Sequence, residues 1–248
     1  MAKIKTERRD FVKYSTLGIL GLAAASGIAL SSSGAIAENR LRPPGAVDEK
    51  EFLALCIKCG QCLQVCPYHS IELADFGKGH GVGTPYIDAN IRGCYACDAV
   101  PCVLACPSGA LDHHTEKATD IKMGIAVLES PKTCLAVTRT PVPAGYDEKM
   151  KDFIANVTNV NPLEDKILEK FDGYEGKDCT LCADMCPMPN PLSAIAMVKK
   201  SSGITRPEIY EGCTGCGVCQ EVCPVSEPAI VIKPRLSYED YYIKGKRS

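Results

Sequence analysis

The sequence predicts an α+β fold in which short strands, cysteine-rich loops and helices alternate. Three observations predict this fold. The 248-residue chain contains 16 cysteines, several-fold more than an ordinary soluble protein, and they lie in four short groups. Each group ends in Cys-Pro, and a small residue followed by an aliphatic residue comes soon after each proline. The recurrence of this pattern indicates repeated structural units.

The first 37 residues have the order of features typical of an export signal. Basic residues come first, an apolar run follows, and small residues end at Ala37, where we expect cleavage. The pair Arg8-Arg9 resembles the twin-arginine motif, although Glu7 stands where Ser or Thr is usual. A chance arginine pair in an ordinary secretion signal and a retained N-terminal anchor are the alternatives. Residues 1–37 are therefore interpreted as a twin-arginine signal peptide of a periplasmic protein.

The cysteine spacing predicts four [4Fe–4S] clusters. The first and last groups read Cys-x2-Cys-x2-Cys-x3-Cys-Pro, and the second has two more residues in its second gap. The third group lacks one member, which Cys134 can supply from upstream. Closely spaced cysteines wrap one cluster, while the last cysteine reaches a neighbouring cluster. In chain order, the predicted ligands are Cys56, Cys59, Cys62 and Cys66; Cys94, Cys97, Cys102 and Cys106; Cys134, Cys179, Cys182 and Cys186; and Cys213, Cys216, Cys219 and Cys223.

Other uses of cysteine explain the pattern less well. A zinc ribbon has no need for a third cysteine at the next step or for Cys-Pro. Covalent haem requires a histidine directly after Cys-x2-Cys, and none is present. A disulfide scaffold would leave four repeated groups unexplained. Iron–sulfur sites must be loaded where thiols stay reduced, which agrees with export after folding.

The small-aliphatic pair after each proline predicts the start of a strand beside a cluster. Proline restricts the cysteine before it to extended conformations and opens a turn, which allows a strand to follow. The four predicted strand starts are Ser70-Ile71, Ala110-Leu111, Ala194-Ile195 and Ala229-Ile230.

A helical hairpin is predicted inside the third cysteine group, over residues 141–178. Apolar residues recur at helical spacing from Met150 onward. A second helix is predicted to begin at Pro162, because Asn161 is suited to the N-cap and proline to the first helical position. The hairpin is interpreted as a lid over a cluster or, alternatively, as a surface that docks a partner.

Several other features are given no chemical role. The glycine-rich segment 77–83 matches neither nucleotide-binding motif and is expected to be a connector. The net charge of −2 gives no electrostatic reason to expect a nucleic-acid partner. Because the cysteines suffice as ligands, the four histidines are expected to be surface residues: His69, His80, His113 and His114.

Beyond the cysteines, several motifs resemble the NapG/MauM family of ferredoxin-type proteins, with NapG the more similar branch. The resemblance covers nearly the whole chain. It is carried by Arg40-Leu41-Arg42-Pro43-Pro44-Gly45-Ala46, Gly83-Thr84-Pro85-Tyr86, Cys106-Pro107-Ser108-Gly109-Ala110-Leu111-Asp112 and Met123-Gly124-Ile125-Ala126-Val127-Leu128.

The resemblance implies two bacterial ferredoxin-like modules, one nested in the other. Residues 38–90 with 200–248 would form the outer module, and residues 91–199 the inner one, including the hairpin. Wider four-cluster ferredoxin subunits imply the ligand sets. These are Cys56, Cys59, Cys62 with Cys223; Cys213, Cys216, Cys219 with Cys66; Cys94, Cys97, Cys102 with Cys186; and Cys134, Cys179, Cys182 with Cys106.

The resemblance also implies a function and partners. The protein would be the electron-transfer component of a quinol dehydrogenase, paired with a polytopic membrane partner, NapH. It would feed periplasmic nitrate reductase or the cytochromes that donate to it. The residues themselves indicate no catalytic site and no small-molecule substrate, since the thiols serve as ligands. The alternatives are a redox factor for maturation of an exported enzyme and an electron-transfer subunit of a molybdenum oxidoreductase.

Overall fold

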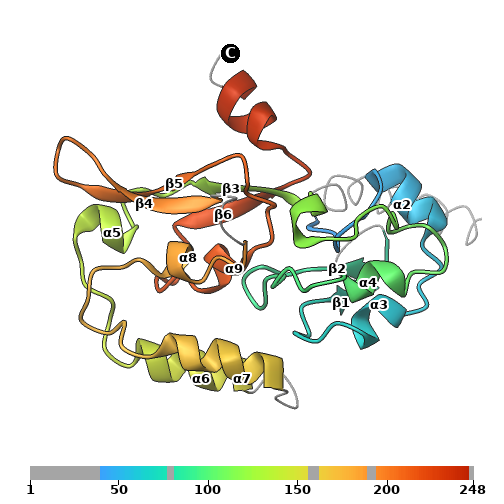
Figure 1. Cartoon of the computed structure of the whole chain (residues 1–248), viewed down its shortest axis with the longest axis horizontal. Helices are drawn as coiled ribbons and strands as arrows, with labels where there is room; N and C mark the ends of the chain where they lie inside the picture. Colours follow the sequence, from blue (N-terminus) through green and yellow to red (C-terminus); the bar gives the residue numbers. More distant parts are fainter. Residues whose placement is uncertain (1–39, 77–80, 156–161, 189–193, 246–248) are drawn as a thin grey trace, which may run out of the picture.

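The computed structural model describes residues 40–76, 81–155, 162–188 and 194–245. The expected signal peptide lies outside the described residues. Figure 1 shows two halves side by side, which we call the first module (residues 40–122) and the second module (residues 123–140 and 179–245). No helix among the described residues is long and apolar enough to cross a membrane.

The first module is built from short elements around its cysteine loops. Its longest helix, α2, begins where the Asp48 side chain accepts hydrogen bonds from the backbone N–H groups of Lys50 and Glu51. The strands β1 and β2 pair in antiparallel fashion. The elements are α2 (Glu49–Leu55), α3 (Gln61–Gln64), β1 (Glu72–Leu73), β2 (Pro85–Tyr86), α4 (Pro101–Leu104) and a 3-10 turn (Ala118–Asp120).

The second module has longer strands in two antiparallel pairs. β3 pairs with β6, with Gly124 opposite Pro234, and β4 pairs with β5, with Ile195 opposite Ile209. Its elements outside the hairpin region are β3 (Gly124–Leu128), α5 (Leu135–Thr138), α8 (Leu181–Asp184), β4 (Ile195–Lys199), β5 (Thr205–Ile209), α9 (Val218–Glu221), β6 (Ile230–Pro234) and a C-terminal helical segment (Glu239–Lys244).

The strand starts predicted after the prolines are found in two places. β4 begins at Ile195 and β6 at Ile230. Ile71 directly precedes β1, whereas Leu111 forms only an isolated bridge with Ala46. The site at Leu111 differs because it pairs with the single residue Ala46, so no ladder extends from it.

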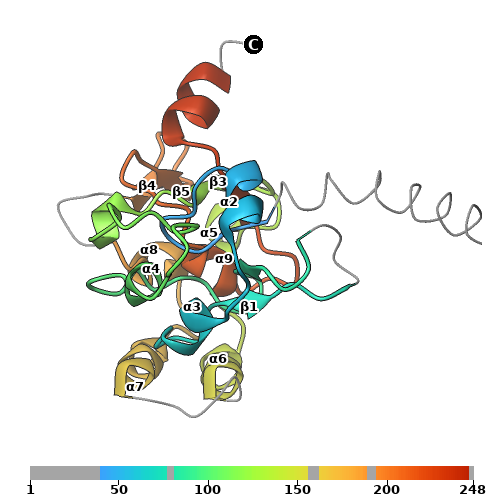
Figure 2. The ribbon, with the colours of Figure 1, turned by 90° about the vertical axis from the view of Figure 1, so that its right-hand side faces the viewer.

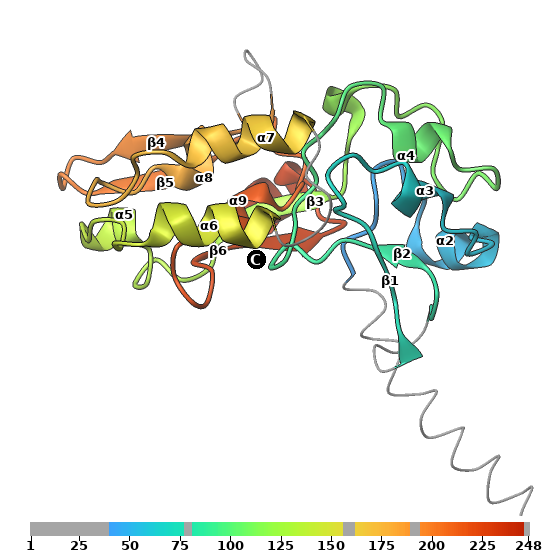
Figure 3. The same cartoon turned by 90° about the horizontal axis from the view of Figure 1, so that it is seen from below.

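Residues 141–178 form a pair of helices that we call the helical insert. It contains α6 (Tyr146–Ala155), α7 (Pro162–Leu168) and a 3-10 turn (Glu169–Phe171). The two helices lie side by side (Figure 3), on the opposite side of the molecule from the C-terminal segment (Figure 2). An isolated bridge between Pro141 and Asp178 closes the base of the insert. Phe171 is fully buried and belongs to the same apolar core as residues of both modules.

The modules follow one another in the chain, which differs from the nested division of residues 38–90 with 200–248 around 91–199. Helix α3 packs against α4 inside the first module, and α8 packs against α9 inside the second. Each cysteine group therefore has the next group in the chain as its neighbour.

One ion-pair cluster joins the start of the described chain to its far end. Glu49 on α2 accepts hydrogen bonds from Arg42 Nε at 3.0 Å and from Arg235 at 2.7 Å. Arg42 is buried and its guanidinium lies 4.6 Å from the ring centroid of Phe52, a cation–π contact. Arg42, which belongs to the motif Arg40-Leu41-Arg42-Pro43-Pro44-Gly45-Ala46, therefore has a structural role.

Candidate metal centres

The sixteen cysteines line four cavities, four to each. We name the sets quartets A to D. Quartet A is Cys56, Cys59, Cys62 and Cys106; quartet B is Cys66, Cys94, Cys97 and Cys102; quartet C is Cys186, Cys213, Cys216 and Cys219; quartet D is Cys134, Cys179, Cys182 and Cys223. Cys134 thus lies with Cys179 and Cys182, although about 45 residues separate it from them.

The fourth member of each quartet differs from the nested expectation. Quartet A contains Cys106 instead of Cys223, and quartet D contains Cys223 instead of Cys106. Quartet B contains Cys66 instead of Cys186, and quartet C contains Cys186 instead of Cys66. The reason is the packing of α3 on α4 and of α8 on α9, which brings consecutive groups together within each module.

The same local design positions the cysteines in each group. The third cysteine lies in a helix of a single turn, as Cys62 does in α3 and Cys219 in α9. This turn carries the chain away from its own cavity, so the following Cys-Pro lines the neighbouring one. The residue before the second cysteine has a left-handed backbone in three groups: Lys58, Ala96 and Gly215. For Lys58 and Ala96 this conformation costs about 1–2 kcal/mol, a strain typical of binding loops.

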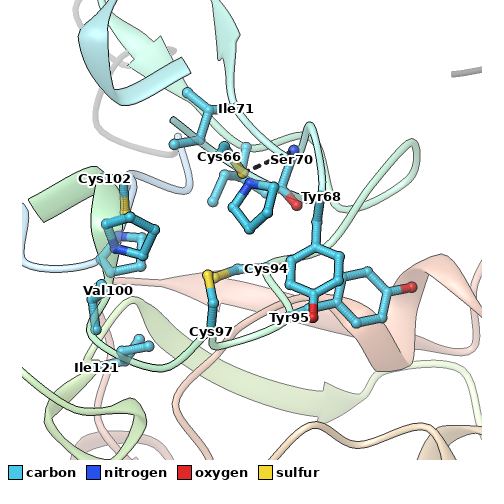
Figure 4. Close-up of a pocket in the computed structure, with 14 residues that line it drawn as sticks. Cys66, Tyr68, Ser70, Ile71, Cys94, Tyr95, Cys97, Val100, Cys102 and Ile121 are labelled. Atoms are coloured by element: carbon cyan, nitrogen blue, oxygen red, sulfur yellow. Dashed lines mark hydrogen bonds between the residues drawn. The ribbon is translucent and has the colours of Figure 1, made fainter. Parts of the chain in front are cut away.

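Figure 4 shows how quartet B surrounds its cavity. Cys66, Cys94 and Cys97 come from loops and Cys102 from α4, and apolar side chains line the cavity together with them. The backbone N–H of Ser70 donates to Cys66 Sγ at 3.4 Å. Tyr68 and Tyr95 lie beside the cavity with ring centroids 4.9 Å apart.

Burial raises the pKa of most of these thiols, and the charges of neighbouring cysteines add to the effect. The pKa rises to about 11 for Cys62, Cys97 and Cys179 and to about 12 for Cys102. The thiolate is the form that binds iron. Four thiolates in one such cavity therefore require compensating positive charge, which a metal cluster supplies.

Backbone N–H groups point at several sulfurs. Ala126 donates to Cys213 Sγ at 3.5 Å, and Ala229 donates to Cys223 Sγ at 3.3 Å. Burial acts to raise the pKa of Cys106, but hydrogen bonds led by the backbone of Ser108 outweigh it and the pKa is lowered. Hydrogen bonds of this kind stabilise thiolates and tune an iron–sulfur site.

The lining of the cavities also suits a cluster. Each is lined by four cysteines and otherwise mostly by apolar side chains. Among the described residues, no three His, Cys, Asp or Glu side chains converge closely enough to hold a single metal ion. Four sulfurs instead surround each cavity, and this all-thiolate donor set is the one that [4Fe–4S] clusters use.

The quartets differ in their access to solvent. Of the sixteen cysteines, only Cys59 in quartet A is exposed. Its neighbour Ile57 is 65% exposed, an unusual position for a large apolar side chain. Quartet A is therefore the most accessible of the four.

A buried charged cluster lies where the two modules and the helical insert meet. Arg92 contacts Glu164 of the insert at 3.2 Å and Glu221 of α9 at 3.5 Å, and all three side chains are almost fully buried. Burial raises the pKa of Glu221 to about 7, against the opposing effect of Arg92. Arg92 is 72 positions from Glu164 and 129 positions from Glu221, so the sequence contains no local signal for this charged cluster.

His69 belongs to the edge of this cluster, contrary to its expected place on the surface. Its Nδ1 lies 3.2 Å from Glu164 Oε1, and its side chain is 35% exposed. His113 and His114 are exposed as expected, and His80 lies outside the described residues.

Two family models match parts of the chain. A 4Fe-4S dicluster domain matches residues 55–110, and a 4Fe-4S binding domain matches residues 213–226. The first match contains the first two cysteine groups together. This agrees with quartets A and B, in which each of these groups contributes its fourth cysteine to the cavity of the other.

Whole-length relatives are ferredoxin-type proteins. The chain is 32% identical to ferredoxin-type protein NapG of Escherichia coli, over 94% of this chain and 88% of that protein. It is 31% identical to the methylamine utilization ferredoxin-type protein MauM of Methylorubrum extorquens, over 95% and 93%. NapG of Haemophilus influenzae is 32% identical over 93% of this chain and 73% of that protein. No solved structure matches the chain.

Proposed function

The chain belongs to the NapG/MauM family of ferredoxin-type iron–sulfur electron-transfer proteins, and we propose that it holds four [4Fe–4S] clusters and relays electrons from a quinol-oxidising membrane partner towards periplasmic nitrate reductase. The observation that carries the proposal is the sorting of all sixteen cysteines into four quartets, each around its own cavity. Every cysteine of the chain then has iron to bind.

The residues of the chain have a supporting task. When bound, such clusters accept and release single electrons. The quartets hold them, the backbone N–H groups of Ser70, Ala126 and Ala229 bind ligand sulfurs, and the apolar lining excludes water. These features set a reduction potential rather than bind a substrate. Quinol oxidation is therefore assigned to the partner, a membrane protein similar to NapH.

The proposed location is the periplasm. Residues 1–37 carry the features of a twin-arginine signal, and that route moves proteins after folding. Loading the clusters before export avoids disulfide formation among the thiols in an oxidising compartment. Fusion of residues 1–37 to a reporter that folds before export tests this step. Replacement of both Arg8 and Arg9 by lysine is expected to abolish export.

Chemical analysis of the purified protein tests the cofactor content. Anaerobically purified chain is expected to contain about sixteen iron and sixteen sulfide, four of each per cluster. Zinc in place of iron, or sulfide well below that of four clusters, would overturn the proposal.

Respiration assays test the pathway. Deletion of the gene is expected to slow quinol-dependent nitrate reduction while nitrate reduction driven by artificial dyes is unchanged. An equal loss of both activities, with cofactor missing from the reductase, would instead indicate a maturation role. Because the relatives named MauM are matched as well as those named NapG, methylamine utilization is the second candidate. Loss of growth on methylamine with normal nitrate reduction would favour it.

A further inference from the structure

The two modules meet at the loops of two buried cysteines from different quartets. The backbone N–H of Cys94, a member of quartet B, donates to the backbone oxygen of Cys216, a member of quartet C, at 2.7 Å. Both cysteines are less than a tenth exposed. A single hydrogen bond therefore joins the backbones of two cysteines whose side chains line different cavities.

The approach at this contact is close because of Gly93. A Cβ atom at this position would lie 2.4 Å from the backbone nitrogen of Val218 and 2.7 Å from the backbone carbon of Gly217. Both are main-chain atoms, so no flexible side chain could move aside. Gly93 does not have a left-handed backbone conformation, so the requirement for glycine here is one of space. Any larger residue would force the two cysteine loops apart.

Gly93 is also fixed by hydrogen bonds on both sides. Its N–H donates to Glu221 Oε2 at 2.7 Å, and its carbonyl accepts from the Ser70 hydroxyl at 2.6 Å. Glu221 also accepts from the Tyr95 hydroxyl at 3.1 Å. The second module thus holds, through one buried carboxylate, the residues on either side of Cys94.

We propose that the contact between Cys94 and Cys216 couples the two modules electronically, with Gly93 and Glu221 as the positioning residues of that junction. The proposal rests on the presence of four clusters proposed above. With clusters bound in quartets B and C, one electron at a time would cross this junction, the cluster on one side being oxidised as the cluster on the other is reduced. Because tunnelling slows steeply with distance and is aided by hydrogen-bonded paths, loops held at backbone contact favour it.

The rest of the order follows from the packing within each module. Helix α3, which carries Cys62 of quartet A, packs against α4, which carries Cys102 of quartet B. Helix α8, which carries Cys182 of quartet D, packs against α9, which carries Cys219 of quartet C. The quartets are therefore expected to act in the order A, B, C, D, with A and D at the two ends.

Two variants test the junction. Gly93→Ala inserts a methyl group into the contact, and Glu221→Ala removes the carboxylate while leaving the contact unobstructed. Glu221→Gln is the conservative variant, because its amide oxygen can still accept from Gly93. Glu129→Ala, at an exposed ion pair, is the surface control. Iron and sulfide content is measured first. A wild-type protein with less iron and sulfide than four clusters require would count against the four-cluster proposal and not against the junction.

The readouts are magnetic and kinetic. Pulsed EPR of the reduced full-length protein detects coupling within each module, which serves as the internal standard, and coupling between modules. We expect Gly93→Ala and Glu221→Ala to lose the coupling between modules and to slow electron equilibration between them after rapid partial reduction. Glu221→Gln and Glu129→Ala should retain both. Unchanged coupling in either disruptive variant that keeps its clusters, or coupling across the boundary through quartet A or D, would overturn the proposal. Should Gly93→Ala fail to assemble, Glu221→Ala alone decides.

Discussion

The two modules build the same pair of cavities from differently organised sequences. In the first module, all eight cysteines lie within residues 56–106. In the second, the helical insert separates Cys134 from Cys179, yet quartet D forms as quartet A does. Both modules keep the third cysteine on a one-turn helix and the fourth before a proline. The comparison teaches that these two positions define a cavity, whereas the first cysteine can come from elsewhere in the chain.

The largest expected effect comes from removing cysteines in pairs. Cys134→Ser with Cys223→Ser strikes quartet D alone and is expected to cost about a quarter of the iron, one cluster in four. Cys134→Ser with Cys106→Ser strikes two quartets and is expected to cost about half. Iron and sulfide per chain are the measurement. The nested pairing predicts the reverse result, so the two double variants control each other.

The second effect tests how the insert is joined to the modules. Glu164→Ala removes a buried carboxylate that contacts Arg92 and His69, and breaking such a pair costs about 3–5 kcal/mol. Chemical denaturation followed by circular dichroism under anaerobic conditions gives the change in the free energy of unfolding. A decrease in the free energy of unfolding of less than about 1 kcal/mol, the usual limit for exposed ion pairs, would show that the contacts of Glu164 do not fix the insert to the modules.

The third effect concerns contact of the insert with the second module alone. The Tyr146 hydroxyl on α6 donates to the backbone oxygen of Val222 at 2.6 Å, and both residues are buried. Tyr146→Phe leaves that oxygen without this donor, which we expect to cost about 1–3 kcal/mol. The same denaturation experiment measures it. A larger cost than that of Glu164→Ala would mean that the insert belongs chiefly to the second module.

The smallest effect is expected at the surface of the second module. Lys233 on β6 and Glu129, the residue after β3, form an ion pair at 2.8 Å, and both side chains are substantially exposed. Lys233→Ala is expected to change the free energy of unfolding by about 0–1 kcal/mol, because solvent and salt screen such pairs. Measurements at low and high salt check this, since a true surface pair weakens as salt is added.

The sequence predicted those features of the site that depend on local spacing. The gathering of Cys134 with Cys179 and Cys182 was expected, because no other cysteine remained to complete their set. Helix α7 begins at Pro162, the position indicated by the Asn-Pro pair. Such features are local because one turn of helix and one proline decide where the chain goes next.

The features that escaped prediction depend on tertiary packing. The cavity that each fourth cysteine lines depends on the packing of α3 on α4 and of α8 on α9. The cysteine spacing is the same for this sequential pairing and for the nested pairing. Arg92, Glu164 and Glu221 look like ordinary surface charges until three distant segments bury them together. His69 is predicted to be a surface residue because the cysteines suffice as ligands, and only the packing of the insert reveals its contact with Glu164.

The ion pairs of Glu49 with Arg42 and Arg235 have a consequence for the timing of folding. Glu49 is held by Arg42, seven residues before it, and by Arg235, 186 residues after it. During synthesis, the ion pair between helix α2 and Arg235 therefore forms only after residue 235 has left the ribosome. A chain that ends before residue 235 would retain the Arg42–Glu49 pair but lack the contact that joins α2 to the second module.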